Sequence, residues 1–384
     1  MKQYDVVIVG GGIHGAGCAQ AAAAQGYSCL VLEQYSIPAQ GTSSRSSKLI
    51  HGGLRYLESR QFSLVKECLS ERRILLKNAP KLVKRIPFYI PIYKNSKRTP
   101  LLIRLGLTLY FLLGGGFFKK IAKQKWSQLD HIDTHDLVAV FRYWDAQTDD
   151  AALTNAVLES SRLLNADIIM NAHVEQLQRN SNGYHINYNI DGKIHECHGQ
   201  FVINASGPWV NQLLKKVTPE PDIINIDLVA GTHLVLPGRL EKGIYYLESP
   251  TDGRAVFVAP WKNNILIGTT ETIYTGTPYA VHPTQAEIDY LLAIYNHYFN
   301  NDLTPTDMIE SFAGLRVLPA SVKTAFHRPR DTILHPDNPG DPRLISIYGG
   351  KLTAYRATAE MVINFIKPVL GKANKKADTK NLKI

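Results

Sequence analysis

Near its start the sequence runs from four consecutive apolar residues, Val6 to Val9, into the glycine-rich turn GGGIHG and then into an Ala-rich segment. An apolar run that meets glycines is typical of a buried parallel strand, and Ala16 to Gln25 favours a helix. Gly10, Gly12 and Gly15 form the GxGxxG pattern, in which glycines permit a tight turn, a close approach of backbone N–H groups to a pyrophosphate, and close packing of helix on strand. The pattern predicts a βαβ unit that binds a dinucleotide.

An acidic residue stands where such a unit needs one. Ser28 to Glu33 is a second short apolar segment, and it ends in the acid. A carboxylate at this place can accept hydrogen bonds from ribose hydroxyls, which argues against a glycine turn without a ligand. The motif alone indicates a dinucleotide and leaves both NAD and FAD open.

The length of 384 residues suggests two domains, because single cores rarely grow beyond about 250 to 300 residues. Alternating helix and strand patterns resume at 150–204 and again at 344–366, whereas 228–326 has the short strand patterns of an antiparallel sheet with one helix at 285–299. We therefore expect an α/β fold with a discontinuous nucleotide-binding domain and an inserted antiparallel-sheet domain. The expected bounds are 1–60, 145–222 and 335–384 for the first, and 61–144 and 223–334 for the second.

A second unusual stretch, SSRSSKLIHGGLRYLE at 43–58, combines hydroxyls, glycines and cations. Serine-rich loops of this composition are usually solvated turns. Here an apolar pair lies between Lys48 and His51, and the doublet of Gly52 and Gly53 allows a flat ring to approach the backbone. Such donors suit a long phosphate and ribityl chain, which favours FAD.

The net charge of +10 admits nucleic acid, an anionic membrane surface or anionic small molecules as partners. The sequence has no zinc-finger spacing, RNP-like aromatic strand or long basic helix, so we expect no nucleic-acid partner. The four cysteines are scattered without metal-type spacing, and the first residues contain no secretory signal. This pattern predicts reduced thiols, no metal site and a cytoplasmic location.

The stretch at 43–58 resembles the flavin-contact segment of the FAD-dependent glycerol-3-phosphate dehydrogenases and their oxidase relatives. Further motifs follow in the order found in that family and extend the resemblance over nearly the whole chain: FVINASGPWV (201–210), GTHLVLP (231–237), VFVAPW with IGTTE (256–271), FAGLRVLP (312–319) and YGGKLTAYR (348–356). The resemblance implies a D-amino-acid-oxidase-like flavoprotein, in which a Rossmann-type domain holds extended FAD and the antiparallel sheet closes over the isoalloxazine.

For the cofactor, the resemblance implies residues in four places. The ADP part would be held by Gly10, Gly12, Gly15 and Glu33, the flavin would be lined by Ser43, Ser44, Lys48 and His51, and Ala205 to Gly207 would lie near the pyrophosphate, with Ala205 and Gly207 as the named contacts. Gly350, Lys351, Leu352 and Thr353 would bring a helix N-terminus to the pyrimidine edge, where reduced flavin accumulates negative charge.

For the substrate, the resemblance implies a cluster of cations that binds a phosphate and positions a secondary alcohol. Taken singly, an arginine is usually a solvated surface charge, and a histidine on a strand is more often a core residue than a catalyst. Together the predicted substrate-binding residues are Tyr56, Arg316 and Arg330, and the predicted catalytic residues are Arg55, His233 and Lys351. Arg330 is preferred to Arg328 because it immediately precedes Asp-Thr-Ile-Leu, although the intervening proline departs from the family pattern.

The implied reaction is the oxidation of sn-glycerol 3-phosphate to dihydroxyacetone phosphate. His233 would take the hydroxyl proton while the C2 hydride passes to FAD, and Arg55 and Lys351 would stabilise negative charge. Quinone is the implied electron acceptor. The alternatives are a same-fold enzyme for an amino acid or 2-hydroxy acid, for which one Arg and one Tyr would suffice, and a non-catalytic FAD-containing binding protein.

Residues 105–118 carry no charge and are flanked by Arg104 and by Lys119 and Lys120. The stretch is too short to span a bilayer, which needs about 20 apolar residues. The segment 101–120 is therefore either a buried helix or a membrane-interfacial element, and the family's peripheral membrane location would place it at the inner face of the cytoplasmic membrane. The chain stops soon after the helix that follows Lys351, whereas bacterial family members usually carry a further helical domain, and the basic residues 372–383 predict a frayed tail.

Overall fold

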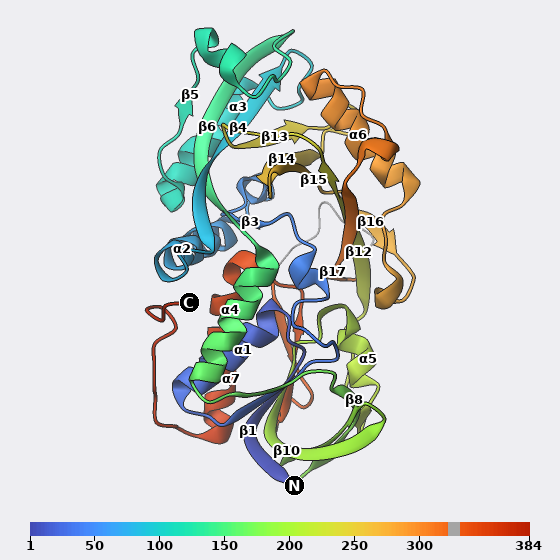
Figure 1. Cartoon of the computed structure of the whole chain (residues 1–384). Helices are drawn as coiled ribbons and strands as arrows, with labels where there is room; N and C mark the ends of the chain where they lie inside the picture. Colours follow the sequence, from blue (N-terminus) through green and yellow to red (C-terminus); the bar gives the residue numbers. More distant parts are fainter. Residues whose placement is uncertain (322–330) are drawn as a thin grey trace.

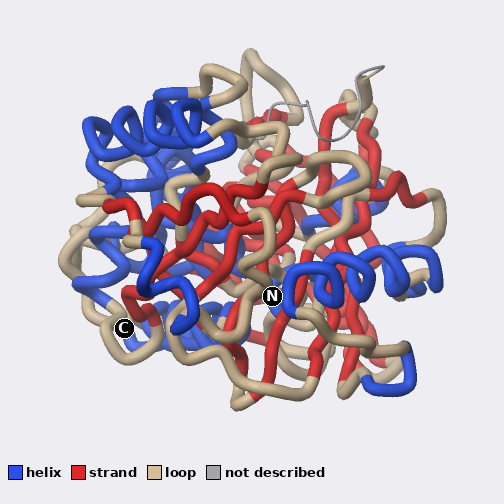
Figure 2. The backbone as a smooth tube through the Cα atoms, turned by 90° about the horizontal axis from the view of Figure 1, so that it is seen from above, coloured by secondary structure: helices blue, strands red, loops and turns tan. Residues whose placement is uncertain are grey.

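The computed structural model describes residues 1–321 and 331–384, and in that part of the chain it contains two large β-sheets (Figure 1). The first sheet and the helices that cover it occupy the lower half of Figure 1, and the second sheet occupies the upper half. Figure 2 shows from above that most of the helices lie outside the strands. The α/β fold class expected from the sequence is confirmed.

The first sheet is built on strand β1 (Lys2–Val9), which pairs in parallel with β10 (Lys193–Asn204) and β2 (Cys29–Leu32). Val6, Val7 and Ile8 are fully buried, as expected for a strand that is covered on both faces. The other strands of this sheet are β7 (Asp167–Ile169), β8 (His173–Asn180), β9 (Gly183–Ile190), β11 (Val217–Thr218), β18 (Ile333–Pro336) and β19 (Leu344–Tyr348).

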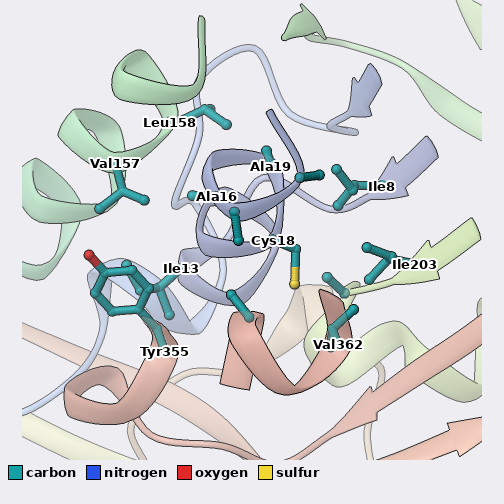
Figure 3. Packing of buried hydrophobic residues seen from close by; sticks show 14 of the residues in the cluster. Ile8, Ile13, Ala16, Cys18, Ala19, Val157, Leu158, Ile203, Tyr355 and Val362 are labelled. Carbon is teal, nitrogen blue, oxygen red and sulfur yellow. The ribbon is translucent and has the colours of Figure 1, made fainter. Parts of the chain in front are cut away.

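Three helices cover one face of this sheet: α1 (Ile13–Gln25), α4 (Asp150–Leu163) and α7 (Tyr355–Leu370). Figure 3 shows α1 between the other two, with its small residues Ala16 and Ala19 among the larger side chains of α4 and α7. A side chain at Gly17 would place its Cβ 2.7 Å from the Tyr355 ring, so small residues are what allow these helices to pack closely. Side chains on the opposite face of β1 and β2 form a cluster with side chains of β8 and β9, in the same sheet, and of the short helix α5 (Val210–Leu214).

The second sheet is almost entirely antiparallel, and among the described strands only β13 and β4 pair in parallel. Its strands are β3 (Leu49–Ile50), β4 (Val83–Tyr93), β5 (Lys119–Lys120), β6 (Leu137–Thr148), β12 (Ile226–Leu236), β13 (Ile244–Glu248), β14 (Ala255–Trp261), β15 (Asn264–Gly268), β16 (Thr272–Tyr274) and β17 (Glu310–Pro319). Side chains alternate between its faces: Phe88 and Ile90 of β4 join the cluster under α2 (Phe62–Asn78) and α3 (Pro100–Tyr110), whereas Tyr89 joins the cluster under α6 (Gln285–Phe299).

Short helical turns connect these elements: η1 (Thr42–Ser44), η2 (Leu54–Leu57), η3 (Phe111–Gly115), η4 (Lys123–Gln128), η5 (Gly207–Trp209), η6 (Pro278–Ala280), η7 (Pro305–Asp307) and η9 (Leu352–Ala354). The first sheet draws its strands from three separate parts of the chain, and the second sheet draws on the segments between them. β3 is an exception to a simple division, since it lies before residue 60 but pairs with β6 in the second sheet. The residue bounds of the two domains stay a prediction.

The expectation of a frayed C-terminal tail is wrong. The segment after α7 packs back against α1 and α2: the backbone N–H groups of Lys376 and Ala377 both donate to the carbonyl of Ala24, and the N–H of Ile384 donates to the carbonyl of Asn78. Thr379 is buried. Polar composition predicted solvent exposure, but backbone hydrogen bonds hold this segment irrespective of its side chains.

Candidate active site

A cavity of about 450 Å³ lies between the two sheets. Its walls include the glycine turn after β1, the loop at 39–56, the loops that follow β10 and β19, and parts of β12 and β17. Ligands of open α/β sheets bind outside the carboxyl ends of the parallel strands, which is where this cavity lies. It is therefore the candidate ligand site.

The glycine turn has the geometry that a dinucleotide cradle requires. Gly10 has φ of +109°, and a Cβ there would lie 2.7 Å from the carbonyl oxygen of Ala205. A Cβ at Gly15 would lie only 1.8 Å from the carbonyl oxygen of Gly10. Gly10 and Gly12 line the cavity, whereas Gly15 lets the helix and the turn pack together. This is the division of roles among the three glycines that the motif implies.

Glu33 is 5% exposed and lines the cavity at the end of β2. Its carboxylate accepts hydrogen bonds from the backbone N–H of Gly11 and, at 2.9 Å, from that of Tyr35. Burial raises the pKa of this carboxyl group, and these hydrogen bonds oppose the rise in part. The remaining lone pairs of the two oxygens are suited to accepting from ribose hydroxyls.

The serine loop contributes to the cavity in part. Ser43 lines it, and its Oγ accepts from the backbone N–H of Ile13, the first residue of α1, at 2.9 Å. Ser44 instead donates to the carbonyl of Gly41 at 3.3 Å and is absent from the cavity wall. Of the two serines, the structure therefore brings only Ser43 to the site.

The structure does not place Lys48 as a flavin-lining cation. Its side chain is buried, and its ammonium lies 2.6 Å from the buried carboxylate of Asp150 and also donates to the carbonyl of Ser44. Lys48 does not line the cavity, although Ser47 and Leu49 do. Asp150 compensates the charge of this ammonium, which would otherwise be costly to bury.

The loop after β19 forms a further part of the cavity wall. Gly350 has φ of +99°, and a Cβ there would lie 2.2 Å from Nε2 of His14, so the two parts of the wall touch at this point. The Oγ1 of Thr353 accepts from the backbone N–H of His51 at 3.2 Å. His51, Gly350, Lys351, Leu352 and Thr353 all line the cavity, and the helical turn η9 begins there.

Ala205 and Gly207, which follow β10, lie on the same wall as the glycine turn. The N–H of Ala205 donates to the carbonyl of Val9, which holds the loop after β10 against the end of β1. Gly207 has φ of +56°, a conformation that favours glycine. The structure thus brings both predicted residues next to the turn at Gly10.

His233 lies on β12 and is 2% exposed. Its Nε2 is 2.8 Å from Oγ of Ser47, and its ring stacks on Phe312 with centroids 5.1 Å apart. Burial lowers the pKa of the imidazole to about 3, with further lowering from the nearby cations Arg316 and Lys48. The ring is therefore neutral near neutral pH and can accept a proton.

A carboxylate that the sequence analysis did not single out lies between the predicted arginines. Glu271 accepts from Nη1 of Arg316 at 2.7 Å and lies 3.7 Å from Nη2 of Arg55, and all three residues line the cavity. Nη2 of Arg316 also donates to Oγ1 of Thr269 at 3.3 Å. Glu271 is the last residue of the IGTTE motif. The motif could be recognised in the sequence, but it did not indicate a role for this glutamate.

Lys351 and Tyr56 meet on the same side of the cavity. The ammonium of Lys351 lies 3.7 Å from the centroid of the Tyr56 ring, and the guanidinium of Arg55 lies 5.9 Å from it. A tyrosine face attracts cations, so Tyr56 holds two of the predicted cations at the cavity. Arg330 lies outside the described residues, and Asp331, the next residue, lines the cavity.

The residues at the cavity fit FAD. Backbone can approach a pyrophosphate closely at Gly10 and Gly12, beside the N-terminus of α1. Two cavity residues, His14 and Trp209, each have a buried ring nitrogen, Nδ1 and Nε1, with no hydrogen-bond partner in the part of the chain that the structure describes. Buried polar atoms are rarely left unpaired, so these atoms are suited to a bound polar ligand. The spacing of GGGIHG did not indicate a role for His14.

Comparison with known proteins agrees with this geometry. Residues 5–361 match the family model described as FAD dependent oxidoreductase. The chain is 36% identical over 374 residues to a glycerol-3-phosphate dehydrogenase of Pseudomonas aeruginosa, and the aligned region covers 95% of this chain and 72% of that protein. It is 35% identical over 384 residues to a D-erythritol 1-phosphate dehydrogenase of Brucella abortus, with 95% of this chain and 74% of that protein covered.

Among solved structures, the chain is similar to a glycerol-3-phosphate dehydrogenase of Bacillus halodurans in complex with FAD. The TM-score is 0.77 at 28% sequence identity, and the match covers 99% of this chain and 67% of that chain. The family match spans both sheets and includes the glycine turn, Glu33 and the loop after β19. The chain therefore belongs to the family of FAD-dependent oxidoreductases.

Proposed function

We propose that this oxidoreductase converts glycerol 3-phosphate to dihydroxyacetone phosphate. The observation that carries the proposal is the convergence of Arg55, Arg316 and Lys351 with the buried imidazole of His233 on the cavity that also contains the glycine turn. Relatives named for glycerol 3-phosphate support the same substrate.

Several cations favour a phosphate dianion over a carboxylate, for which a single arginine and a tyrosine would suffice. A guanidinium presents two parallel N–H donors that match phosphate oxygens. Glu271 fixes the orientation of Arg316 before substrate binds, which reduces the entropy lost on binding. We propose Arg316 as a phosphate ligand assisted by Tyr56, and Arg330 as a second ligand because its neighbour Asp331 lines the cavity.

His233 is the proposed base for the C2 hydroxyl. Its neutral ring can take the proton at Nε2, the atom that lies 2.8 Å from Oγ of Ser47. A pKa of about 3 gives little driving force for proton uptake at neutral pH. Burial is the main cause of this low pKa, and a bound phosphate dianion, by offsetting the positive charge of Arg316, would raise the pKa of His233 in part.

Arg55 and Lys351 are the proposed stabilisers of negative charge during the reaction. FAD, when bound, supplies the acceptor for the hydride that leaves C2. Both side chains lie at the Tyr56 ring, and the helical turn at Leu352 adds the positive potential of its N-terminus beside Lys351. These groups are fixed before substrate arrives, which is the arrangement that favours a transition state carrying negative charge.

A longer polyol phosphate is the second candidate substrate, because one relative of comparable identity is named D-erythritol 1-phosphate dehydrogenase. The same cations would bind its phosphate. The two candidates differ only in the length of the polyol chain beyond the secondary alcohol, so a direct comparison of both substrates distinguishes them.

We propose quinone as the electron acceptor. The protein would reach it by binding to the inner face of the cytoplasmic membrane. None of the helices in the described ranges is long and apolar enough to cross a bilayer. On α3 and in the residues after it, however, Leu101, Leu105, Leu112 and Phe117 are 67%, 59%, 71% and 79% exposed. Ile103, Leu107 and Tyr110 of the same segment are buried, so one side is core and the other side is an exposed apolar surface.

This apolar surface has basic residues beside it. Arg104 lies on α3, and Lys119 and Lys120 form the exposed strand β5. Apolar side chains with cations at their edge suit the boundary of an anionic bilayer, where the former enter the headgroup layer and the latter meet lipid phosphates. Of the two sequence-based alternatives for this segment, the buried helix describes its buried side, and we propose its exposed side as the interfacial element.

The substrate proposal is tested by oxidation assays with an artificial electron acceptor. Glycerol 3-phosphate should give dihydroxyacetone phosphate, and glycerol at the same concentration should give no turnover because it lacks the phosphate. Faster turnover with erythritol 1-phosphate would favour the second candidate. Turnover with lactate or an amino acid but with neither polyol phosphate would overturn both.

A further inference from the structure

Three aromatic residues from distant parts of the chain meet at the end of the cavity where Glu33 lies. Tyr35 follows β2, Trp209 lies in η5, and Tyr279 lies in η6. The Tyr35 and Trp209 rings are 6.1 Å apart, Trp209 and Tyr279 are 5.1 Å apart, and Tyr35 and Tyr279 are 6.4 Å apart, all measured between centroids. All three residues line the cavity.

Tyr279 differs from the other two in where it comes from. Tyr35 and Trp209 follow strands of the first sheet, whereas η6 follows β16 of the second sheet. The hydroxyl of Tyr279 donates to Oε1 of Gln34 at 2.7 Å, directly beside Glu33 in the sequence. Tyr279 is 57% exposed, so it stands at the mouth of the cavity and joins the two sheets across it.

The surroundings of these rings suit the adenosine part of a dinucleotide. Glu33 is placed for ribose hydroxyls, and aromatic faces stack on a purine because every base has a π-face. Nε1 of Trp209 is buried without a hydrogen-bond partner among the described residues, which leaves one donor for a ligand. Burial and the nearby Glu33 carboxylate raise the pKa of Tyr279, so its hydroxyl stays protonated and able to donate.

We infer that Tyr35, Trp209 and Tyr279 form an aromatic clamp on the adenosine end of FAD, in which Tyr279 is contributed by the second sheet and slows release of the cofactor. The inference depends on the cofactor, which the family establishes, and not on the identity of the substrate. It gives the second sheet a part in holding the cofactor at the end of the cavity that contains Glu33.

Release of FAD from the holoprotein tests this inference, because free FAD is more fluorescent than bound flavin. Tyr279→Phe removes only the hydrogen bond to Gln34 and should raise the dissociation rate about three- to ten-fold. Tyr279→Ala also removes both ring contacts and should raise it about thirty-fold or more. Tyr274→Phe is the matched control: its hydroxyl donates within the same segment, to Thr277, and Tyr274 does not line the cavity, so its dissociation rate should equal that of the wild type.

Ligand fragments distinguish a clamp from a merely structural contact. In Tyr279→Ala apoprotein, the affinity for ADP should fall by the same factor as that for FAD, whereas the affinity for FMN, which lacks adenosine, should be unchanged. Quenching of tryptophan fluorescence by ADP should be largely lost in Trp209→Phe. The clamp would be ruled out by an unchanged FAD dissociation rate in Tyr279→Ala, or by an equal loss of FMN and FAD affinity.

Discussion

Burial of His233 beside Phe312 and near Arg316 sets the protonation state of its ring. The sequence predicted a base at this position only through family resemblance, since a histidine on a strand is usually a core residue. The structure places the ring on β12 within hydrogen-bond distance of Ser47, which lines the cavity. Its part in catalysis stays a prediction.

We expect His233→Asn to lower the turnover number about 10²- to 10⁴-fold, because it removes the proposed base while retaining a polar side chain of similar shape. The flavin content and the KM for glycerol 3-phosphate should change little. Steady-state kinetics and the flavin spectrum of the purified variant measure both. Turnover equal to that of the wild type would exclude His233 as the base.

The same residue should make the protein less stable in acid. An unfolded histidine binds a proton below pH 6.5, whereas folded His233 does so only near pH 3. The folded state therefore binds fewer protons between these values, and the stability contributed by this site falls as the pH drops from about 6.5 towards 3. At pH 5 the cost is about 2 kcal/mol.

Urea unfolding at pH 7 and pH 5 checks this expectation. The loss of unfolding free energy between the two pH values should be about 2 kcal/mol larger in the wild type than in His233→Asn. Since all other titrating groups are common to both proteins, an identical loss in the two would contradict the neutral buried state.

At Arg316 we expect the planar shape of the guanidinium to matter in addition to its positive charge. Arg316→Lys keeps the positive charge but loses the fork that donates to both Glu271 and Thr269. We expect the KM for glycerol 3-phosphate to rise about ten-fold or more. Arg179→Lys is the matched control, because Arg179 also contacts two carboxylates, Asp337 and Asp341, but lies outside the cavity wall. A similar KM in both variants would argue against Arg316 as a phosphate ligand.

At the scale of elements, the segments with simple periodicity were predictable and the irregular ones were not. The predicted helix at 285–299 coincides with α6, and the strands at Val6 to Val9 and 344–348 lie in β1 and β19. Strand β4 contains two prolines and pairs with β6 more than forty residues later, so local pattern gave no sign of it. The pairing of Lys48 with Asp150 was not predictable for a related reason, since the two residues are distant in sequence.

Helix α3 and the residues after it should govern membrane binding. We expect the double variant Leu105→Asp, Leu112→Asp to bind vesicles containing anionic phospholipid at least ten-fold more weakly, because a charged side chain is costly in the headgroup and acyl boundary. Vesicle flotation measures this. Activity with a water-soluble acceptor should be retained.

The control for that experiment is Leu163→Asp at the end of α4, where the leucine is 78% exposed but belongs to a helix of the first sheet rather than to α3. Vesicle binding equal to the wild type is expected for it. Unchanged flotation of the α3 double variant would remove this segment from the membrane proposal.

For the whole molecule, the cavity between the sheets is the feature that local sequence patterns could not define. The sequence indicated the two kinds of sheet, and most of the predicted site residues line the cavity, but the sequence did not indicate Glu271, His14 or the contact between Tyr279 and Trp209. These contacts join segments that lie far apart in the chain. A pattern read along the sequence carries no signal for them.

Because both sheets line this cavity, FAD should stabilise the whole molecule. At a free concentration 100 times its Kd, FAD should add about 2.7 kcal/mol to the free energy of unfolding. Thermal unfolding of the apoprotein with and without FAD should therefore show a rise of several degrees in Tm. FMN at the same concentration should give a smaller rise, since the glycine turn and Glu33 serve the ADP part. Equal rises would contradict that placement.

The most direct test of the central claim is anaerobic reduction of the bound flavin. Purified holoprotein is mixed with glycerol 3-phosphate without oxygen while the visible flavin absorbance is recorded. We expect rapid bleaching with glycerol 3-phosphate and none with glycerol or lactate, because we propose that the cations at the cavity bind a phosphate and that His233 takes the proton. A flavin that stays oxidised with glycerol 3-phosphate, in a protein that retains its full FAD content, would contradict the account.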